Sequence, residues 1–255
     1  MALTFSLAAV QLVMLAGVRI VAFLVIAPPF SHGTIPGSIK AALSLGVALA
    51  VAPHLPPGDL GQSLTTGGFV ADLVLQAVIG VALGFLVALA FAAIQSAGNL
   101  IDLFGGFQIA QAFDPMSQTN SAQFSRLYQL LAVVLLFASN GYQLVLGGLV
   151  RTFDALPIGA ALDLGTYSSL ATSGLTQMFV AALQIAGPLI VVLFLADVGL
   201  GLLTRVAPAL NAFALGFPLK ILLTLSFGSL ALLALPRIIA GLADTSVSTL
   251  LGGAR

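Results

Sequence analysis

The chain has 255 residues, of which 60% are hydrophobic and only 6% are charged, with eight basic and eight acidic side chains. An ordinary soluble domain has about 25% charged residues. So few charges cannot solvate the surface of a soluble globule of this size, which excludes a cytosolic enzyme. The even charge balance also excludes a nucleic-acid-binding protein. The surplus of apolar surface must therefore face lipid or other protein.

The sequence also offers little metal or redox chemistry. It has no cysteine, which excludes disulfides and thiolate catalysis, and its only histidines are His32 and His54. These two lie in different predicted loops without a third ligand at useful spacing, so we expect no metal and no cofactor. The apolar run after Met1 lacks a basic segment, and we interpret it as a retained helix rather than a cleavable signal peptide.

Six apolar stretches predict the elements, because a bilayer core of about 30 Å requires roughly 20 residues of helix. In chain order they are residues 4–27, 39–55, 69–94, 127–150, 177–203 and 212–235. The first ends at Pro28–Pro29 and the second is short and closed by Pro53. Long connections are expected at 95–126 and 153–176. The sequence thus predicts an all-α integral membrane protein of about six long, partly broken helices, in a single domain over 1–255.

The membrane topology is not readable from the loop charges. In a six-span protein one side would carry Lys40, Arg126 and Arg205, and the other Arg151, Arg237 and Arg255. There is no tryptophan and there are only three tyrosines, so the usual interfacial aromatic belt is missing. These features fit poorly with six plain helices in lipid and favour burial of apolar surface against other subunits.

Charged residues at Arg19, Asp72, Asp197 and Lys220 lie within or at the edge of the expected helices. They could form an ion or proton path, they could be paired structural charges, or a helix boundary could be misplaced. Structural pairing is favoured because the carboxylates are not clustered. Asp197 and Arg205 share a helix face but lie about 12 Å apart along it, so we expect each to find another partner.

Glycine and proline positions indicate close packing and a break. Gly80 and Gly84 form a small-xxx-small pair that permits close approach of another helix. Segment 204–220 is interrupted by Pro208, Gly216 and Pro218, with Asn211 and Lys220 among them. It could be a broken helix lining an aqueous cavity, as in transporters, or a tight hairpin at the membrane face.

Segment 102–115 is polar enough to leave lipid but carries Phe104, Phe107, Ile109 and Phe113. Gly105–Gly106 gives a flexible break, and Asp114–Pro115 favours a turn. Such apolar side chains need a packing surface. The segment could be a plug that blocks a channel, or a re-entrant loop packed on its own helices.

Six stretches of the sequence form a recognisable series: 27–30 with 35–36, 105–115, 135–137 with 140–142, 153–159, 196–205 and 208–220. Taken together and in order, they resemble the FliR family of flagellar type III export-gate proteins. Residue 142 is tyrosine where histidine is expected for the family. The run from Gly216 to Lys220 resembles the flagellar branch more than the injectisome branch, SctT.

The resemblance implies a subunit that joins FliP-like and FliQ-like proteins in a closed, helical gate of bent hairpins. FlhB-like and FlhA-like proteins would complete the apparatus, and unfolded flagellar subunits would pass through it. The implied location is the bacterial inner membrane at the flagellar basal body, protruding to the periplasmic side. The resemblance also implies a pore plug at 105–120, with Gly105, Gly106, Phe107, Ile109, Phe113, Asp114, Pro115 and Met116. The implied assembly residues are Asp197, Arg205, Pro208, Asn211, Phe213, Gly216, Phe217, Pro218 and Lys220.

Other function classes remain open on the residues alone. A secondary transporter could use segment 204–220 as its binding site, and the same kind of subunit could serve a virulence type III secretion system. An intramembrane enzyme has a poor basis, since the sequence has no glutamate, no cysteine and no Gly-x-Ser-x-Gly motif. Co-purification with FliP-like and FliQ-like proteins would separate a gate subunit from a transporter.

Overall fold

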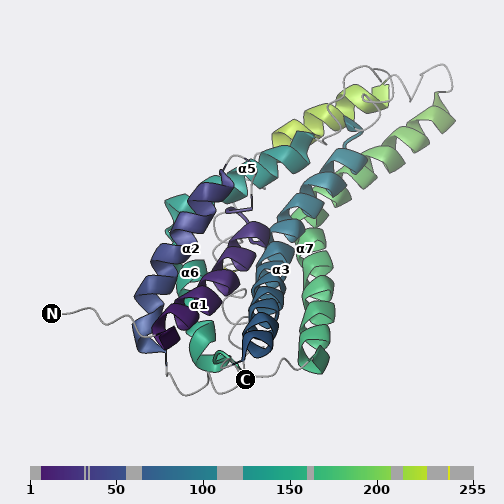
Figure 1. Cartoon of the computed structure of the whole chain (residues 1–255). Helices are drawn as coiled ribbons and strands as arrows, with labels where there is room; N and C mark the ends of the chain where they lie inside the picture. Colours follow the sequence, from purple (N-terminus) through teal and green to yellow (C-terminus); the bar gives the residue numbers. More distant parts are fainter. Residues whose placement is uncertain are drawn as a thin grey trace. The chain divides into compact units, whose positions relative to one another are not determined.

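The computed structural model describes residues 7–31, 33, 35–55, 65–107, 123–159, 164–207, 215–228 and 241 (Figure 1). Throughout these ranges the chain forms helices and turns, without a strand. The helices are α1 (Leu7–Ile26), α2 (Gly37–Val51) with the short 3-10 turn η1 (Ala52–His54), α3 (Thr66–Phe104), α5 (Gln123–Ala138), α6 (Gly141–Ala155) and α7 (Leu164–Val206). A shorter apolar helix follows at Leu215–Gly228. The predicted all-α fold is confirmed.

Four helices of the described chain are long and apolar enough to cross a membrane: α1, α2 with η1, α3 and α7. The pair α5 and α6 adds a fifth candidate if it counts as one span bent by 77°. The prediction of an integral membrane protein is therefore confirmed. Of the sixth expected stretch, 212–235, the structure describes only the helix Leu215–Gly228 and the flanks lie outside the described residues.

Two expected connections are shorter than the sequence indicated, because the long helices absorb polar residues. α3 continues past residue 94 to Phe104, and α7 begins at Leu164 rather than at 177. In the first turns of α7, Ser168, Ser169 and Thr172 donate their hydroxyls to backbone carbonyls three or four residues earlier, at 2.8–2.9 Å. A hydroxyl that is satisfied in this way does not interrupt a helix.

The fourth expected helix, 127–150, is wrong as a single element, because it is broken between α5 and α6. Asn140 adopts a left-handed conformation with φ 57° and immediately precedes Gly141, the first residue of α6. Asparagine tolerates this conformation better than most residues. The 77° bend between α5 and α6 follows from this break.

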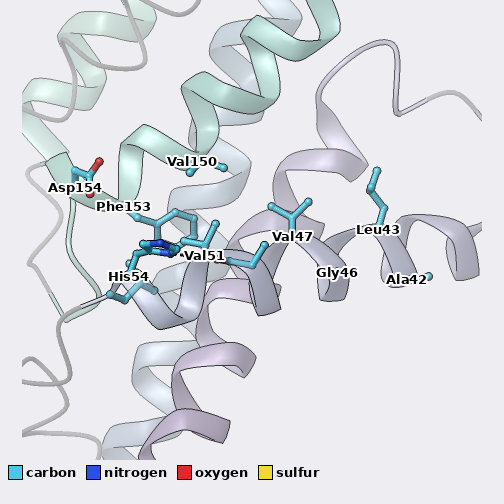
Figure 2. A pocket seen from close by; sticks show the side chains of 11 residues that line it. Ala42, Leu43, Gly46, Val47, Val51, His54, Val150, Phe153 and Asp154 are labelled. Atoms are coloured by element: carbon cyan, nitrogen blue, oxygen red, sulfur yellow. Dashed lines mark hydrogen bonds between the residues drawn. The ribbon is translucent and has the colours of Figure 1, made fainter.

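The chain divides into two compact units, and the first contains Met1–Ala90, Asn140–Gly174 and Leu242–Arg255. Its helices α1 and α2 lie side by side (Figure 1). Gly80 and Gly84 of α3 lie against the backbone of α1. A Cβ atom on Gly80 would overlap the carbonyl oxygen of Arg19. A Cβ atom on Gly84 would lie 3.0 Å from the carbonyl oxygen of Phe23. The predicted close approach at this glycine pair is confirmed. A groove of about 820 Å³ lies between α2 and α6 (Figure 2).

The second unit contains Phe91–Ser139 and Leu175–Gly241. Its buried side chains come from the second half of α3, from α5 and from α7, and include Ile101, Tyr128, Leu136 and Leu193. Gly98 brings α3 against the start of α5, because a Cβ there would lie 2.7 Å from the backbone nitrogen of Ser125. This unit contains the described residues of the two segments singled out in the sequence, 102–115 and 204–220.

Candidate functional site

α3 ends at a pair of glycines at the start of the predicted plug segment. The N–H of Gly105 donates to the carbonyl of Ile101 at 2.8 Å, and that of Gly106 to Leu103 at 3.4 Å. Gly106 has φ +81°, a conformation that favours glycine and commonly ends helices. A Cβ on Gly105 would lie 2.9 Å from the hydroxyl oxygen of Thr224. The break predicted at Gly105–Gly106 therefore lies where the sequence indicated.

Aromatic side chains hold the first residue after this turn. Phe107 packs edge-on against Phe124 of α5, with ring centroids 5.2 Å apart and planes at 64°. Phe124 in turn contacts Tyr128 at 6.5 Å and 61°. The ring of Phe217 lies so close to Gly106 that a Cβ there would be 3.1 Å from it. The two segments singled out in the sequence, 102–115 and 204–220, thus meet at Gly106 and Phe217.

Asp102 links the end of α3 to the start of α5. Its side chain is fully buried, and its two carboxyl oxygens accept the backbone N–H groups of Phe124 at 3.1 Å and Ser125 at 3.0 Å. The first N–H groups of a helix lack partners inside the helix, so a carboxyl group at this place stabilises it. Asp102 therefore holds the end of α3 against the start of α5. This role of Asp102 is not visible in the sequence, because no local motif links residue 102 to residue 124.

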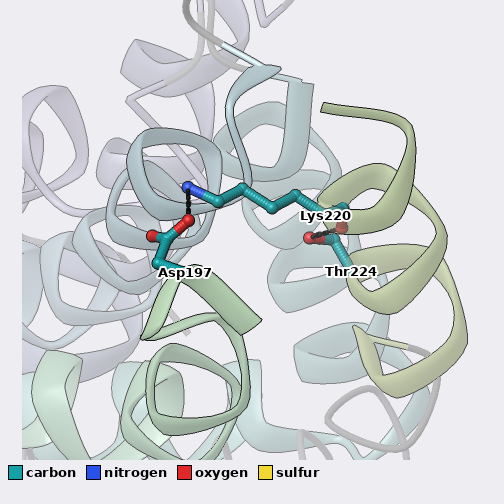
Figure 3. A network of polar contacts seen from close by, with 3 residues as sticks. All are labelled: Asp197, Lys220 and Thr224. Carbon is teal, nitrogen blue, oxygen red and sulfur yellow. Dashed lines mark hydrogen bonds and ion pairs between the residues drawn. The ribbon is translucent and has the colours of Figure 1, made fainter. Parts of the chain in front are cut away.

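An ion pair connects α7 to the helix Leu215–Gly228. Lys220 Nζ lies 2.7 Å from Asp197 Oδ1, with side-chain exposures of 19% for Lys220 and 47% for Asp197 (Figure 3). One turn further on, the hydroxyl of Thr224 donates to the carbonyl of Lys220 at 2.8 Å. The prediction that Asp197 finds a partner other than Arg205 is confirmed. Arg205 itself is exposed near the end of α7.

In the first unit, the fully buried Arg19 is held by neutral groups. Its Nε donates to Gln76 Oε1 at 2.7 Å and its Nη1 to the carbonyl of Thr152 at 3.4 Å. The guanidinium lies 4.2 Å from the centre of the Phe153 ring, a favourable cation–π position. Arg19 thus joins α1, α3 and α6 through neutral groups, rather than through the opposite charge that structural pairing would supply.

Of the remaining predicted site residues, Gly216 and Pro218 lie in the first turns of the helix Leu215–Gly228. A Cβ on Gly216 would be 3.5 Å from Leu200 of α7, an ordinary contact. The other predicted residues lie outside the described residues: Ile109, Phe113, Asp114, Pro115, Met116, Pro208, Asn211 and Phe213. Among the described residues, no three His, Asp or Glu side chains are grouped so that they could hold a metal ion.

The chain matches a family model described as bacterial export proteins, family 1, over residues 10–246. It is 36% identical to the flagellar biosynthetic protein FliR of Escherichia coli (strain K12) over 223 residues, which are 87% of this chain and 83% of the relative. It is 37% identical to the protein of the same name from Pectobacterium carotovorum subsp. carotovorum, over 85% of this chain and 81% of the relative. It is also 25% identical to the Yop proteins translocation protein T of Yersinia pestis, over 79% and 78%. The chain therefore belongs to the bacterial export proteins of family 1, and the resemblance to FliR is confirmed.

Proposed function

We propose that this chain is a structural, pore-forming subunit of the flagellar type III protein-export gate, and not an enzyme. The observation that carries this proposal is the family match over residues 10–246, with flagellar relatives at 36% and 37% identity. The long apolar helices support a place in the bacterial inner membrane, at the flagellar basal body. Both compact units then serve one export-gate domain over 1–255.

The proposed partners are FliP-like and FliQ-like subunits in a hetero-oligomer, with FlhB-like and FlhA-like export proteins around it. The cargo is unfolded flagellar protein. The many large apolar side chains exposed on α7, such as Phe179, Leu195 and Leu202, support this assembly because they require lipid or protein to cover them. The ion pair of Asp197 and Lys220 would keep α7 and the following helix in the arrangement that partners recognise.

Residues 105–120 are the proposed plug of the closed pore. A plug must be held firmly at its ends and still be displaced by a passing polypeptide. The structure supports the first requirement, since Asp102 joins α3 to α5 and Phe107 packs on Phe124. Gly106, with its left-handed backbone and no side chain, gives the segment a turn that does not disturb α3.

The plug is tested by deleting residues 106–116, or by replacing Phe107, Ile109 and Phe113 with alanine, and measuring ion leak in growing cells. We expect a leak of protons and small ions, because apolar side chains that exclude water from the pore are removed. A matched control replaces Val70, Val74 and Val78, exposed apolar residues near the start of α3, with alanine. Normal impermeability together with normal secretion in the deletion variant would refute the plug.

Co-purification tests the wider proposal against a transporter or a virulence-system subunit. A gate subunit forms a stable complex with FliP-like and FliQ-like proteins, whereas a secondary transporter is active alone or as a homo-oligomer. Restoration of swimming in a strain that lacks its own FliR would support the flagellar assignment. Restoration of virulence-factor secretion, but not of swimming, would assign the chain to the virulence branch. The Yersinia pestis protein, at 25% identity, represents that branch.

A further inference from the structure

The groove between α2 and α6 in the first unit is lined by none of the predicted plug or assembly residues. Its volume is about 820 Å³, within the range of small-molecule sites. Leu43, Gly46 and Val47 line it from α2, and Val150 lines it from α6. Its position on the edge of a helix that could cross a membrane makes lipid its most accessible ligand.

The groove has one polar end. His54 and Asp154 both line that end, and Leu43 and Ala42 lie at the opposite end (Figure 2). His54 Nδ1 is 3.3 Å from the carbonyl oxygen of Ala50. The carboxylate of Asp154 can only accept hydrogen bonds. The polar end therefore suits a cationic donor group.

The groove also has the length of one lipid leaflet. From Leu43 to His54 the helix rises by about 16 Å at 1.5 Å per residue, roughly half of a 30 Å hydrocarbon core. The candidate span Gly37–His54 is only 22% buried inside the chain, so its open side is available to hydrocarbon. His54 ends this span, at the level where polar headgroups begin.

We propose that the groove binds one acyl chain of a phosphatidylethanolamine, with the primary ammonium of its headgroup facing Asp154 and His54. A headgroup with net negative charge would meet the carboxylate of Asp154 unfavourably.

Native mass spectrometry of the purified full chain tests this, by titration with phosphatidylethanolamine and phosphatidylglycerol of identical acyl chains. We expect one bound phosphatidylethanolamine, preferred over phosphatidylglycerol by about fivefold. Asp154→Asn should bring the two lipids to nearly equal affinity. A preference for phosphatidylethanolamine that survives in Asp154→Asn, or no preference in the native chain, would overturn the headgroup assignment.

A second variant fills the groove itself. A Cβ on Gly46 has open space around it, so Gly46→Leu occupies the groove without displacing the core and should weaken phosphatidylethanolamine binding at least about tenfold. Gly199→Leu, at an equally open glycine of α7, is the matched control and should bind as the native chain does. Val150→Phe blocks the groove from the opposite wall if Gly46→Leu does not fold.

Equal lipid binding by Gly46→Leu, Val150→Phe and the Gly199→Leu control would overturn the proposal. Co-expression with FliP-like and FliQ-like subunits adds an independent readout. If Gly46→Leu prevents their co-purification while phosphatidylethanolamine still binds as before, the groove is a protein interface and the lipid assignment is wrong. If the lipid is lost and the complex still forms, the lipid assignment stands.

Discussion

Arg19 in the first unit and Asp102 in the second are both fully buried, yet they are held by different kinds of partner. Arg19 binds an amide side chain, a carbonyl and an aromatic ring that all lie inside the regular helices α3 and α6. Asp102 binds backbone N–H groups at the first residues of α5. The first arrangement joins three helices, and the second joins the end of α3 to the start of α5. The comparison indicates that Arg19 has a scaffold role within the first unit, whereas Asp102 holds the end of α3 to the start of α5 in the second.

The largest expected effect comes from removing the partner of the buried cation. Gln76→Leu leaves the Nε of Arg19 without its 2.7 Å acceptor inside an apolar core, and we expect a loss of about 3 kcal/mol in the free energy of unfolding. The double variant Arg19→Met with Gln76→Leu replaces both groups by apolar ones and should recover most of this loss. Thermal unfolding in detergent, followed by circular dichroism, measures both. The scaffold role of Arg19 would be contradicted if Gln76→Leu were as stable as the native chain. It would also be contradicted if the double variant were no more stable than Gln76→Leu.

Asp102→Asn should have the next largest effect. An amide supplies one acceptor oxygen where the carboxyl group supplies two, so the N–H of Phe124 or of Ser125 loses its partner, at a cost of about 2 kcal/mol. Hydrogen exchange should become faster at the start of α5 and stay unchanged in α1. Asp197→Asn, the same chemical change at a half-exposed carboxyl, should cost less than half as much. Faster exchange spread evenly over both units would contradict a local role for Asp102.

The smallest effect is expected at the ion pair between α7 and the following helix. A double-mutant cycle with Asp197→Asn and Lys220→Met should give a coupling below about 1 kcal/mol, because the Asp197 side chain is 47% exposed. The cycle is measured by thermal unfolding of the chain alone and again in its complex. A coupling energy above about 2 kcal/mol in the chain alone would contradict the expectation that solvent exposure weakens this ion pair.

The sequence predicted what depends on local chemistry. Pro28–Pro29 marks the end of α1, which stops at Ile26, and the glycine pair at Gly80 and Gly84 marks a close helix contact. The turn at Gly105–Gly106 was also readable, because a glycine after a helix commonly takes a left-handed conformation. Each of these features is decided by residues within a few positions of one another.

The sequence did not reveal what depends on distant partners. Asp102 appeared to belong to a loop because it is polar, but its hydrogen bonds to residues 124 and 125 allow it to lie inside α3. α7 begins at Leu164 rather than at 177, and the helix backbone accepts the hydroxyls of Ser168 and Ser169 in its first turns. The pair of Arg19 with Gln76 spans 57 positions, and no spacing rule connects them.

The length of α7 has a consequence for the life of the protein in the cell. Its 43 residues extend for about 64 Å at 1.5 Å per residue, roughly twice the 30 Å hydrocarbon core of a bilayer. A helix of that length cannot be covered by one bilayer unless it is strongly tilted or bent, so part of its apolar surface meets water in an unassembled copy. Such a copy is a substrate for quality-control proteases. Synthesis of this chain would therefore need to be matched to synthesis of the subunits that cover it.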